Sequence, residues 1–338
     1  MTSLRVALVV TGKLEYRGLA EAMRRLFPTI DFIIASNQRE DELFDTTSCK
    51  VDPIRNATRF AQARENAGTQ NEDHYPLPKI DELVESLAGS LCGRDAADFA
   101  VLIEDLELVN RGNERAVIQA VHDAVDRHLE RVKKRKNAPQ KLDNILRERA
   151  SFHLFDPMIE AYFFADDDAL RNSGTTFHPP QCSRQGLDPE RFRVCCDEPF
   201  FDENLGECFK GFDSLRNEPI RHSKRKESNC PWSGQGREFH PKKYLCYLCR
   251  RDSPFEFCTS YSETGDTQSF GGIATLQSLD WAKVFVGDSC APYLRALVED
   301  LEDALGMRPA LTNWPQSPTS FALTARYQAS IRRVLRNV

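Results

Sequence analysis

The sequence contains no apolar run that approaches the roughly 20 residues needed to span a bilayer. The segment from Met1 to Val10 runs directly into a strand-like stretch and lacks the layout of a secretory signal. An excess of positive charge is also absent, because the formal net charge of the 338 residues is −6. The chain as a whole therefore exerts no electrostatic attraction on nucleic acid. We expect a cytoplasmic protein that makes no contact with a membrane.

Several common catalytic signatures are missing as well. The sequence has no Walker A loop, no Rossmann glycine fingerprint and no serine-hydrolase elbow. If ATP is used, another subunit must supply that chemistry. The 11 cysteines are scattered through the chain and odd in number, which favours reduced thiols, with metal binding as the alternative.

What the sequence does contain is a pattern of buried strands alternating with amphipathic helices. Apolar or extended segments predict strands at 4–10, 31–35, 98–103 and 152–155, and helical spacing predicts helices at 15–27, 80–92, 113–134 and 157–170. This order predicts an α/β fold with a mostly parallel sheet flanked by helices.

We divide the chain into three parts. Residues 1–171 form the predicted α/β core. Residues 172–238 are rich in Pro, Gly, Cys and charge, which predicts a Cys-rich irregular insertion. Residues 239–338 are a helical part expected to complete the core, with helices predicted at 240–248, 289–305 and 318–335.

Acidic residues follow two of the predicted strands. Asp105 and Glu107 lie two apart on extended backbone, so their side chains share one face at the carboxyl end of a strand. Glu15 begins the helix after the first strand and is placed to face the same crevice. Such close carboxylates fit a cation such as Mg²⁺. The alternative is that all three are solvated acids, favoured by helix dipoles.

Glu160 is a further candidate site residue, because it interrupts an otherwise apolar segment. A buried carboxylate costs free energy unless it is paired or bound to a metal. The alternatives are that it points outward from a half-exposed helix or forms a structural ion pair.

Five segments together resemble a bacterial family of TOPRIM-like proteins, related to the overcoming-lysogenization-defect (OLD) nucleases. Members are often encoded beside AAA- or SMC-like ATPases in presumed phage-defence cassettes. The segments are VVTGKLEYRGLAEAMRRLFP, VLIEDLELVN, FHLFDPMIEAYFFADDDAL, HPKKYLCYL and LDWAKVF…CAPYLRALVEDLEDALG. The resemblance implies a TOPRIM-like sheet, a nucleic-acid substrate (DNA or RNA) and an ATPase partner; a homo-oligomer is also compatible with it.

The resemblance also assigns residues. TOPRIM proteins carry a glutamate before the glycine of the first turn, and OLD-like members add an acid on the next helix. Here that glycine is Gly12 and the helix acid is Glu15, but Thr11 replaces the glutamate and is a poor metal ligand or general base. The family's Asp-x-Asp motif matches Asp105 and Glu107.

In the same way, Lys242 or Lys243 matches the cation that OLD-like nucleases place against the scissile phosphate. The resemblance thus implies an Mg²⁺- or Mn²⁺-dependent nuclease in an antiphage system. Because of Thr11, the alternative is a non-catalytic, degenerate TOPRIM subunit that serves as a scaffold for the ATPase.

A third hypothesis concerns zinc. Cys246 and Cys249 form a C-x-x-C pair, with Cys230 upstream and His240 nearby, and structural Zn²⁺ commonly uses such a pair. The chain would then be a zinc-containing nucleic-acid-binding module. The alternative is that both helical cysteines pack as small apolar groups.

Basic runs occur at 131–136 and 221–226, and the predicted last helix carries further arginines. These runs are either solvated surface or contacts for a nucleic-acid backbone or an acidic partner.

Overall fold

The computed structural model describes most of the α/β core and parts of the remaining chain. The described residues are 3–36, 38, 79–106, 111, 114–134, 141–176, 178–180, 182, 188–195, 197, 200, 237–251, 261, 263, 271–286, 291–314 and 334–337.

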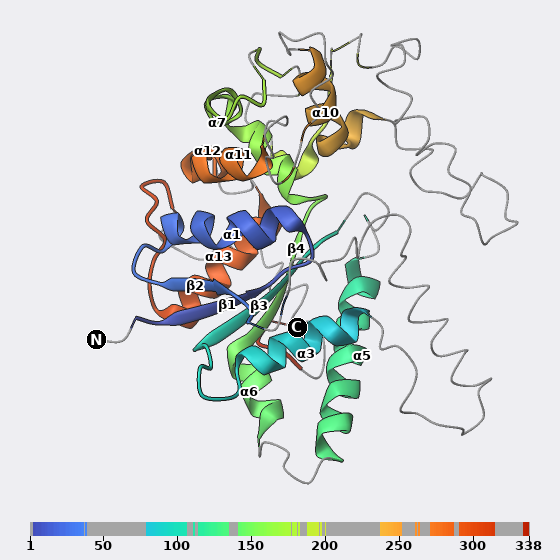
Figure 1. Cartoon of the computed structure of the whole chain (residues 1–338), viewed down its shortest axis with the longest axis vertical. Coiled ribbons are helices and arrows are strands. Elements are labelled where there is room, and N and C mark those ends of the chain that lie inside the picture. Colours follow the sequence, from blue (N-terminus) through green and yellow to red (C-terminus); the bar gives the residue numbers. More distant parts are fainter. Residues whose placement is uncertain are drawn as a thin grey trace, which may run out of the picture.

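A four-stranded parallel sheet lies at the centre of the molecule (Figure 1), in the order β2-β1-β3-β4. Its strands are β1 (Arg5–Val9), β2 (Asp31–Ile34), β3 (Phe99–Asp105) and β4 (Ala150–Phe155). All four predicted strands are confirmed, and the α/β class with a parallel sheet is confirmed with them. All four strands run in the same direction, so their carboxyl ends lie at the same end of the sheet.

Each strand buries side chains on both faces, as parallel sheets require. Val6 and Leu8 of β1 face one core, whereas Ala7 and Val9 face another. Figure 1 shows α1 (Lys13–Leu26) and α13 (Pro292–Leu305) on one side of the sheet. The other side carries α3 (Lys79–Ser90), α5 (Glu114–Lys133) and α6 (Leu142–Arg149).

Helix α1 forms where its apolar spacing predicts it. Leu19 and Met23 are fully buried and Phe27 nearly so, as expected of apolar residues at helical spacing, and the helix predicted at 15–27 is confirmed. On another face of α1, Gly18 allows α11 (Gly272–Ser278) to approach, because a β-carbon at Gly18 would lie 3.1 Å from the Leu276 side chain.

The single helix predicted at 157–170 is wrong. The structure has a 3-10 helix, η3 (Ile159–Ala165), followed by α7 (Asp167–Asn172). Asp166 separates the two helices with extended backbone, and its side chain accepts a hydrogen bond from the Asp168 N–H. This N-cap starts a new helix and breaks the earlier one.

Helices from the later part of the chain lie beyond α1, on its side away from the sheet, and contact η3 after the carboxyl end of β4 (Figure 1). They are α10 (Pro241–Arg251), α11, α12 (Trp281–Val284) and the short 3-10 turns η4 (Pro189–Arg191) and η7 (Arg237–Phe239). The predicted helix at 240–248 is confirmed as α10, and the one at 289–305 as α13.

The predicted helix at 318–335 falls largely outside the described residues, and its last two residues, Val334 and Leu335, lie in a bend. Residues 334–337 run beside β4. The Asn337 side-chain amide donates to the Phe152 carbonyl at 2.6 Å and accepts from the Phe152 N–H at 2.9 Å. Arg336 donates its N–H to the Ala150 carbonyl. These contacts occupy the outer edge of β4.

Candidate functional site

Glu15 lies in the first turn of α1, just beyond the carboxyl end of β1, and is only 5% exposed. Its carboxylate folds back over Gly12. A β-carbon at Gly12 would lie 2.0 Å from the Glu15 Oε2 atom. Gly12 is therefore required for this close approach, and the approach fixes where the carboxylate sits.

Glu160, in η3, is the second buried carboxylate, with 3% exposure. The interpretation that it points outward is therefore wrong. No lysine or arginine among the described residues lies within 4.0 Å of either carboxylate. Burial, and then the charge of Glu160, raise the pKa of Glu15 to about 7. The charge of Glu160 therefore favours the protonated form of Glu15.

Lys242 supplies the nearest positive charge that acts on this pair. It lies in the first turn of α10, its ammonium is 43% exposed, and it forms an ion pair with Glu263. Its charge lowers the pKa of Glu15, against the larger effects of burial and of Glu160. Lys243, next to it, is half-buried.

Tyr261 brings a hydroxyl group to the same place. It is 7% exposed, and its hydroxyl has no hydrogen-bond partner within the described part of the chain. The oxygen packs against Gly272, where a β-carbon would lie 2.4 Å from it and 3.1 Å from the Leu14 side chain. Burial, and then the charge of Glu160, raise the pKa of Tyr261 well above its ordinary value. The phenol therefore keeps its proton as a donor.

A buried donor normally has an acceptor, so the Tyr261 hydroxyl is a candidate to bind a ligand at this site. Tyr261 could not be found from the sequence, because it belongs to no motif and its neighbours come from distant segments.

Asp105 has a supporting position. Its Oδ1 atom accepts a hydrogen bond from the Ile159 N–H at 3.2 Å, at the start of η3. Asp105 thereby positions the residue preceding Glu160. Glu107 lies outside the described residues, so the predicted set of Glu15, Asp105 and Glu107 stays a prediction. Within the described ranges, no three His, Cys, Asp or Glu side chains gather as metal ligands.

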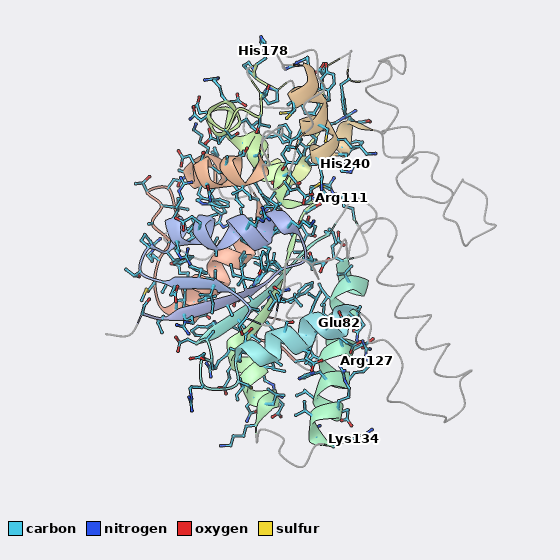
Figure 2. The ribbon with its side chains drawn as sticks, in the orientation of Figure 1. Glu82, Arg111, Arg127, Lys134, His178 and His240 are labelled. Carbon is cyan, nitrogen blue, oxygen red and sulfur yellow. The ribbon has the colours of Figure 1, made fainter. Side chains whose placement is uncertain are left out.

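The residues proposed for zinc have mixed surroundings. Cys249 is buried in the core, and its thiol donates to the Thr175 carbonyl at 3.1 Å. Cys246 packs partly buried against the same core. His240, at the start of α10 (Figure 2), is buried; burial and the adjacent lysines lower its pKa well below the ordinary value. Cys230 lies outside the described residues, and the zinc hypothesis stays a prediction.

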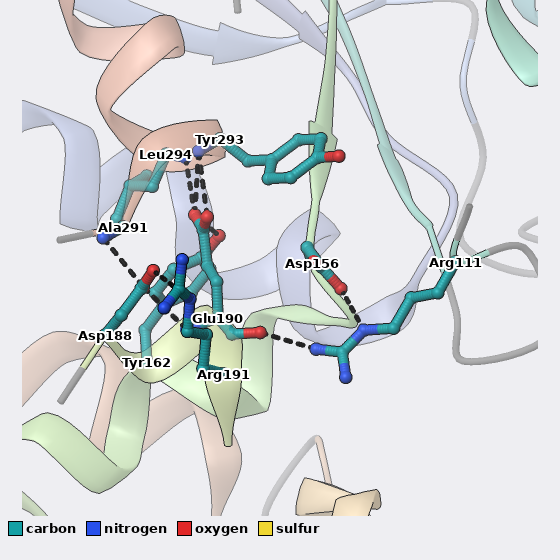
Figure 3. A network of polar contacts seen from close by, with 9 residues as sticks. All are labelled: Arg111, Asp156, Tyr162, Asp188, Glu190, Arg191, Ala291, Tyr293 and Leu294. Atoms are coloured by element: carbon teal, nitrogen blue, oxygen red, sulfur yellow. Dashed lines mark hydrogen bonds and ion pairs between the residues drawn. The ribbon is translucent and has the colours of Figure 1, made fainter. Parts of the chain in front are cut away.

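A second carboxylate network holds the site in place (Figure 3). Glu190 accepts hydrogen bonds from the N–H groups of Tyr293 and Leu294 at the start of α13, each at 3.0 Å, and from the Tyr162 hydroxyl at 2.8 Å. Asp188 accepts from the Ala291 N–H at 2.9 Å. Both carboxylates satisfy donors that a helix N-terminus leaves unpaired.

This network reaches Glu160 through η3, since Tyr162 lies two residues beyond it. On its other side, Arg111 binds the Asp156 carboxylate at 2.6 Å and the Glu190 carbonyl at 2.5 Å (Figure 3). Burial raises the pKa of Asp156 to about 6, although the Arg111 charge opposes this. Sequence analysis missed Asp188 and Glu190, because they lie in the segment predicted to be an irregular insertion.

Comparison of the chain with protein-family models, curated proteins and solved structures gives no match. In the described part of the chain, no helix is both long and apolar enough to cross a bilayer. Function must therefore be argued from the geometry of the site. That geometry combines two buried carboxylates, an ammonium and a phenol donor at the carboxyl edge of a parallel sheet, where open α/β sheets bind ligands.

Proposed function

We propose that this chain is a TOPRIM-like phosphodiesterase that cleaves nucleic acid with the help of Mg²⁺ or Mn²⁺. The observation that carries the proposal is the Glu15–Glu160 pair. Two buried carboxylates repel one another, which raises the free energy of the folded protein. A cation bound between them removes this repulsion. A pair of this kind is expected where a ligand of positive charge binds.

The donor set fits such an ion. Mg²⁺ prefers hard oxygen ligands and is commonly held by one or two carboxylates together with substrate phosphates. Glu15 and Glu160 would hold it here, and no sulfur or nitrogen donor is needed. When bound, the ion supplies Lewis acidity toward a phosphate and favours ionisation of water.

The protein's own groups have separate roles in this proposal. Lys242 lies where its charge offsets the negative charge that develops on the phosphate during cleavage. The Tyr261 hydroxyl donates a hydrogen bond to a phosphate oxygen. Glu15 serves this site as a ligand of the ion, since a bound cation would favour its ionised form against the burial and the Glu160 charge that raise its pKa to about 7. Asp105 positions the start of η3, and thereby Glu160.

A second candidate function rests on Thr11. This residue is 7% exposed at the end of β1, where the resemblance places a catalytic glutamate. A hydroxyl there supplies no negative charge and no useful base. The same site would then bind a cation or phosphate without cleaving, and the chain would serve an AAA- or SMC-like ATPase as a binding or scaffold subunit in antiphage defence.

A cleavage assay separates the two. Supercoiled plasmid and labelled RNA are incubated with purified protein and Mg²⁺ or Mn²⁺, comparing wild type with Glu15→Gln and Glu160→Gln. Glu148→Gln is the matched control, since Glu148 is an exposed glutamate on α6, away from both the carboxylate pair and α1. Cleavage that both site variants lose and the control keeps supports the phosphodiesterase.

Cleavage that survives in both site variants contradicts the proposal. If wild type cleaves nothing with either metal, alone or with a co-purified ATPase, the non-catalytic function is favoured instead.

A further inference from the structure

The outer face of α1 is basic although the whole chain is acidic. Lys13, Arg17 and Arg25 are exposed, and Arg24 is partly exposed beside them. A depression of about 540 Å³ opens on this face, between α1 and the end of α11. Its lining consists of Arg17, Ala20, Glu21, Arg24, Arg25 and Gln277. Three guanidinium groups thus surround a space that contains one carboxylate.

Two of these guanidinium groups are held in place by backbone carbonyls. Arg24 donates to the Phe32 carbonyl at 2.5 Å and to the Glu21 carboxylate at 2.9 Å. Arg25 donates to the Gln277 carbonyl. A carbonyl carries no net charge, so this bond orients Arg25 without neutralising it, whereas Arg24 is also paired with Glu21 at 2.9 Å and lies 3.9 Å from the Asp31 carboxylate. Because a guanidinium has five N–H donors, an arginine anchored in this way can also bind an anion.

The basic face continues toward the carboxylate pair. At about 1.5 Å per residue, the side chains from Arg24 to Lys13 extend about 17 Å along α1. Lys13 lies in the same helical turn as Glu15 but points to a different face, because side chains two residues apart on a helix do not face each other. The charge of Lys242 acts on Glu15 from α10. Positive charge therefore follows α1 from the depression to the end of the helix that carries Glu15.

The chemistry of the lining selects among anionic partners. Arginine forks match phosphate geometry with two parallel hydrogen bonds. Among the described residues, no aromatic side chain lines the depression, and single-strand binders that hold bases use aromatic stacking platforms. The surface therefore suits a sugar–phosphate backbone, and its described lining offers no platform for base stacking.

We propose that the depression along α1 binds the phosphodiester backbone of a nucleic acid without sequence preference and guides it to the Glu15–Glu160 pair. Guidance of the nucleic acid to the Glu15–Glu160 pair rests on the proposed function, whereas binding at the depression does not. The nucleic-acid contact suggested by the sequence for the basic run at 131–136 is thereby assigned to α1. The first residue of that run, Arg131, pairs with the buried Asp81 at 3.2 Å.

Binding is tested by fluorescence anisotropy with labelled duplex DNA, single-stranded DNA and RNA, in EDTA so that no cleavage occurs. The test variant is Arg17→Glu/Arg25→Glu. Its matched control is Lys133→Glu/Lys134→Glu, which makes the same charge change at the far end of α5; Figure 2 shows Lys134 there, well away from α1. Thermal melting of each variant checks that the fold is intact.

We expect the test variant to lose about tenfold or more in affinity for at least one of the three probes, and the slope of log affinity against log salt to fall by about 2. The control should lose far less. The probe that wild type binds most tightly identifies DNA or RNA as the source of the backbone.

Equal losses in the two variants, or a loss only in the control, would overturn the inference. Binding and cleavage are measured separately on the same wild-type protein, the first in EDTA and the second with Mg²⁺ or Mn²⁺, so a failure of one is distinguished from a failure of the other. A failure of cleavage with intact, α1-dependent binding sinks only the proposed function.

Discussion

Replacing Glu15 with glutamine should stabilise the protein at alkaline pH. The carboxylate is buried beside Glu160, and its pKa rises from an ordinary 4.5 to about 7. A folded-state pKa above the unfolded value means that the fold prefers the protonated form. Below pH 4.5 both states are protonated and nothing is lost. Between pH 4.5 and 7, stability falls by about 1.4 kcal/mol per pH unit.

Above pH 7 the full cost is present, about 3 kcal/mol. Glutamine resembles the neutral acid and avoids this cost. For a chain of 338 residues, about 3 kcal/mol corresponds to a rise in Tm of about 5 °C. We therefore expect Glu15→Gln to melt about 5 °C above wild type at pH 8 and together with it at pH 4.

The assay is thermal melting followed by circular dichroism across this pH range. Glu21→Gln removes the same charge from an exposed position on the same helix and should shift Tm little at any pH. Added Mg²⁺ should raise the Tm of wild type at pH 8 but not that of Glu15→Gln. Equal melting of wild type and Glu15→Gln at pH 8 would refute the reasoning, because the buried charge would then cost nothing.

Three further predictions follow from the same contacts. Gly12→Ala should keep the fold but lose cleavage, because the new β-carbon displaces the flexible Glu15 carboxylate; melting and the plasmid assay check this. Tyr261→Phe should change the unfolding free energy by less than about 0.5 kcal/mol yet reduce kcat, since its hydroxyl has no partner within the described residues. Glu190→Ala should cost about 3 kcal/mol in urea unfolding, because it leaves the Tyr293 and Leu294 N–H groups and the Tyr162 hydroxyl without their acceptor; a cost below 1 kcal/mol would contradict the network.

The strands and main helices could be predicted because their signal is local. The run at 4–10 is apolar throughout, as a strand buried on both faces requires, and it forms β1. The stripe of Leu19, Met23 and Phe27 likewise follows from helical spacing alone. Glu15 and Glu160 were each predicted as candidate site residues from local sequence as well. Glu15 follows the first strand, and Glu160 interrupts an apolar segment.

What could not be predicted is which distant groups meet. Glu190 satisfies N–H groups 103 and 104 residues away, and no spacing rule connects them. Tyr261 reaches the site only because Gly272 leaves room for its hydroxyl. The pairing of Glu15 with Glu160 depends on where η3 lies, and Asp105 helps to place η3 by accepting the Ile159 N–H.

The contacts of Asn337 bear on how this protein can join others. Partners often attach by adding a strand to an exposed sheet edge. On the β4 side, the Asn337 amide already imitates the backbone of such a strand, by bonding both the N–H and the carbonyl of Phe152. A partner strand would have to displace it first. Strand addition on that side is thus opposed, which limits uncontrolled edge-to-edge aggregation there.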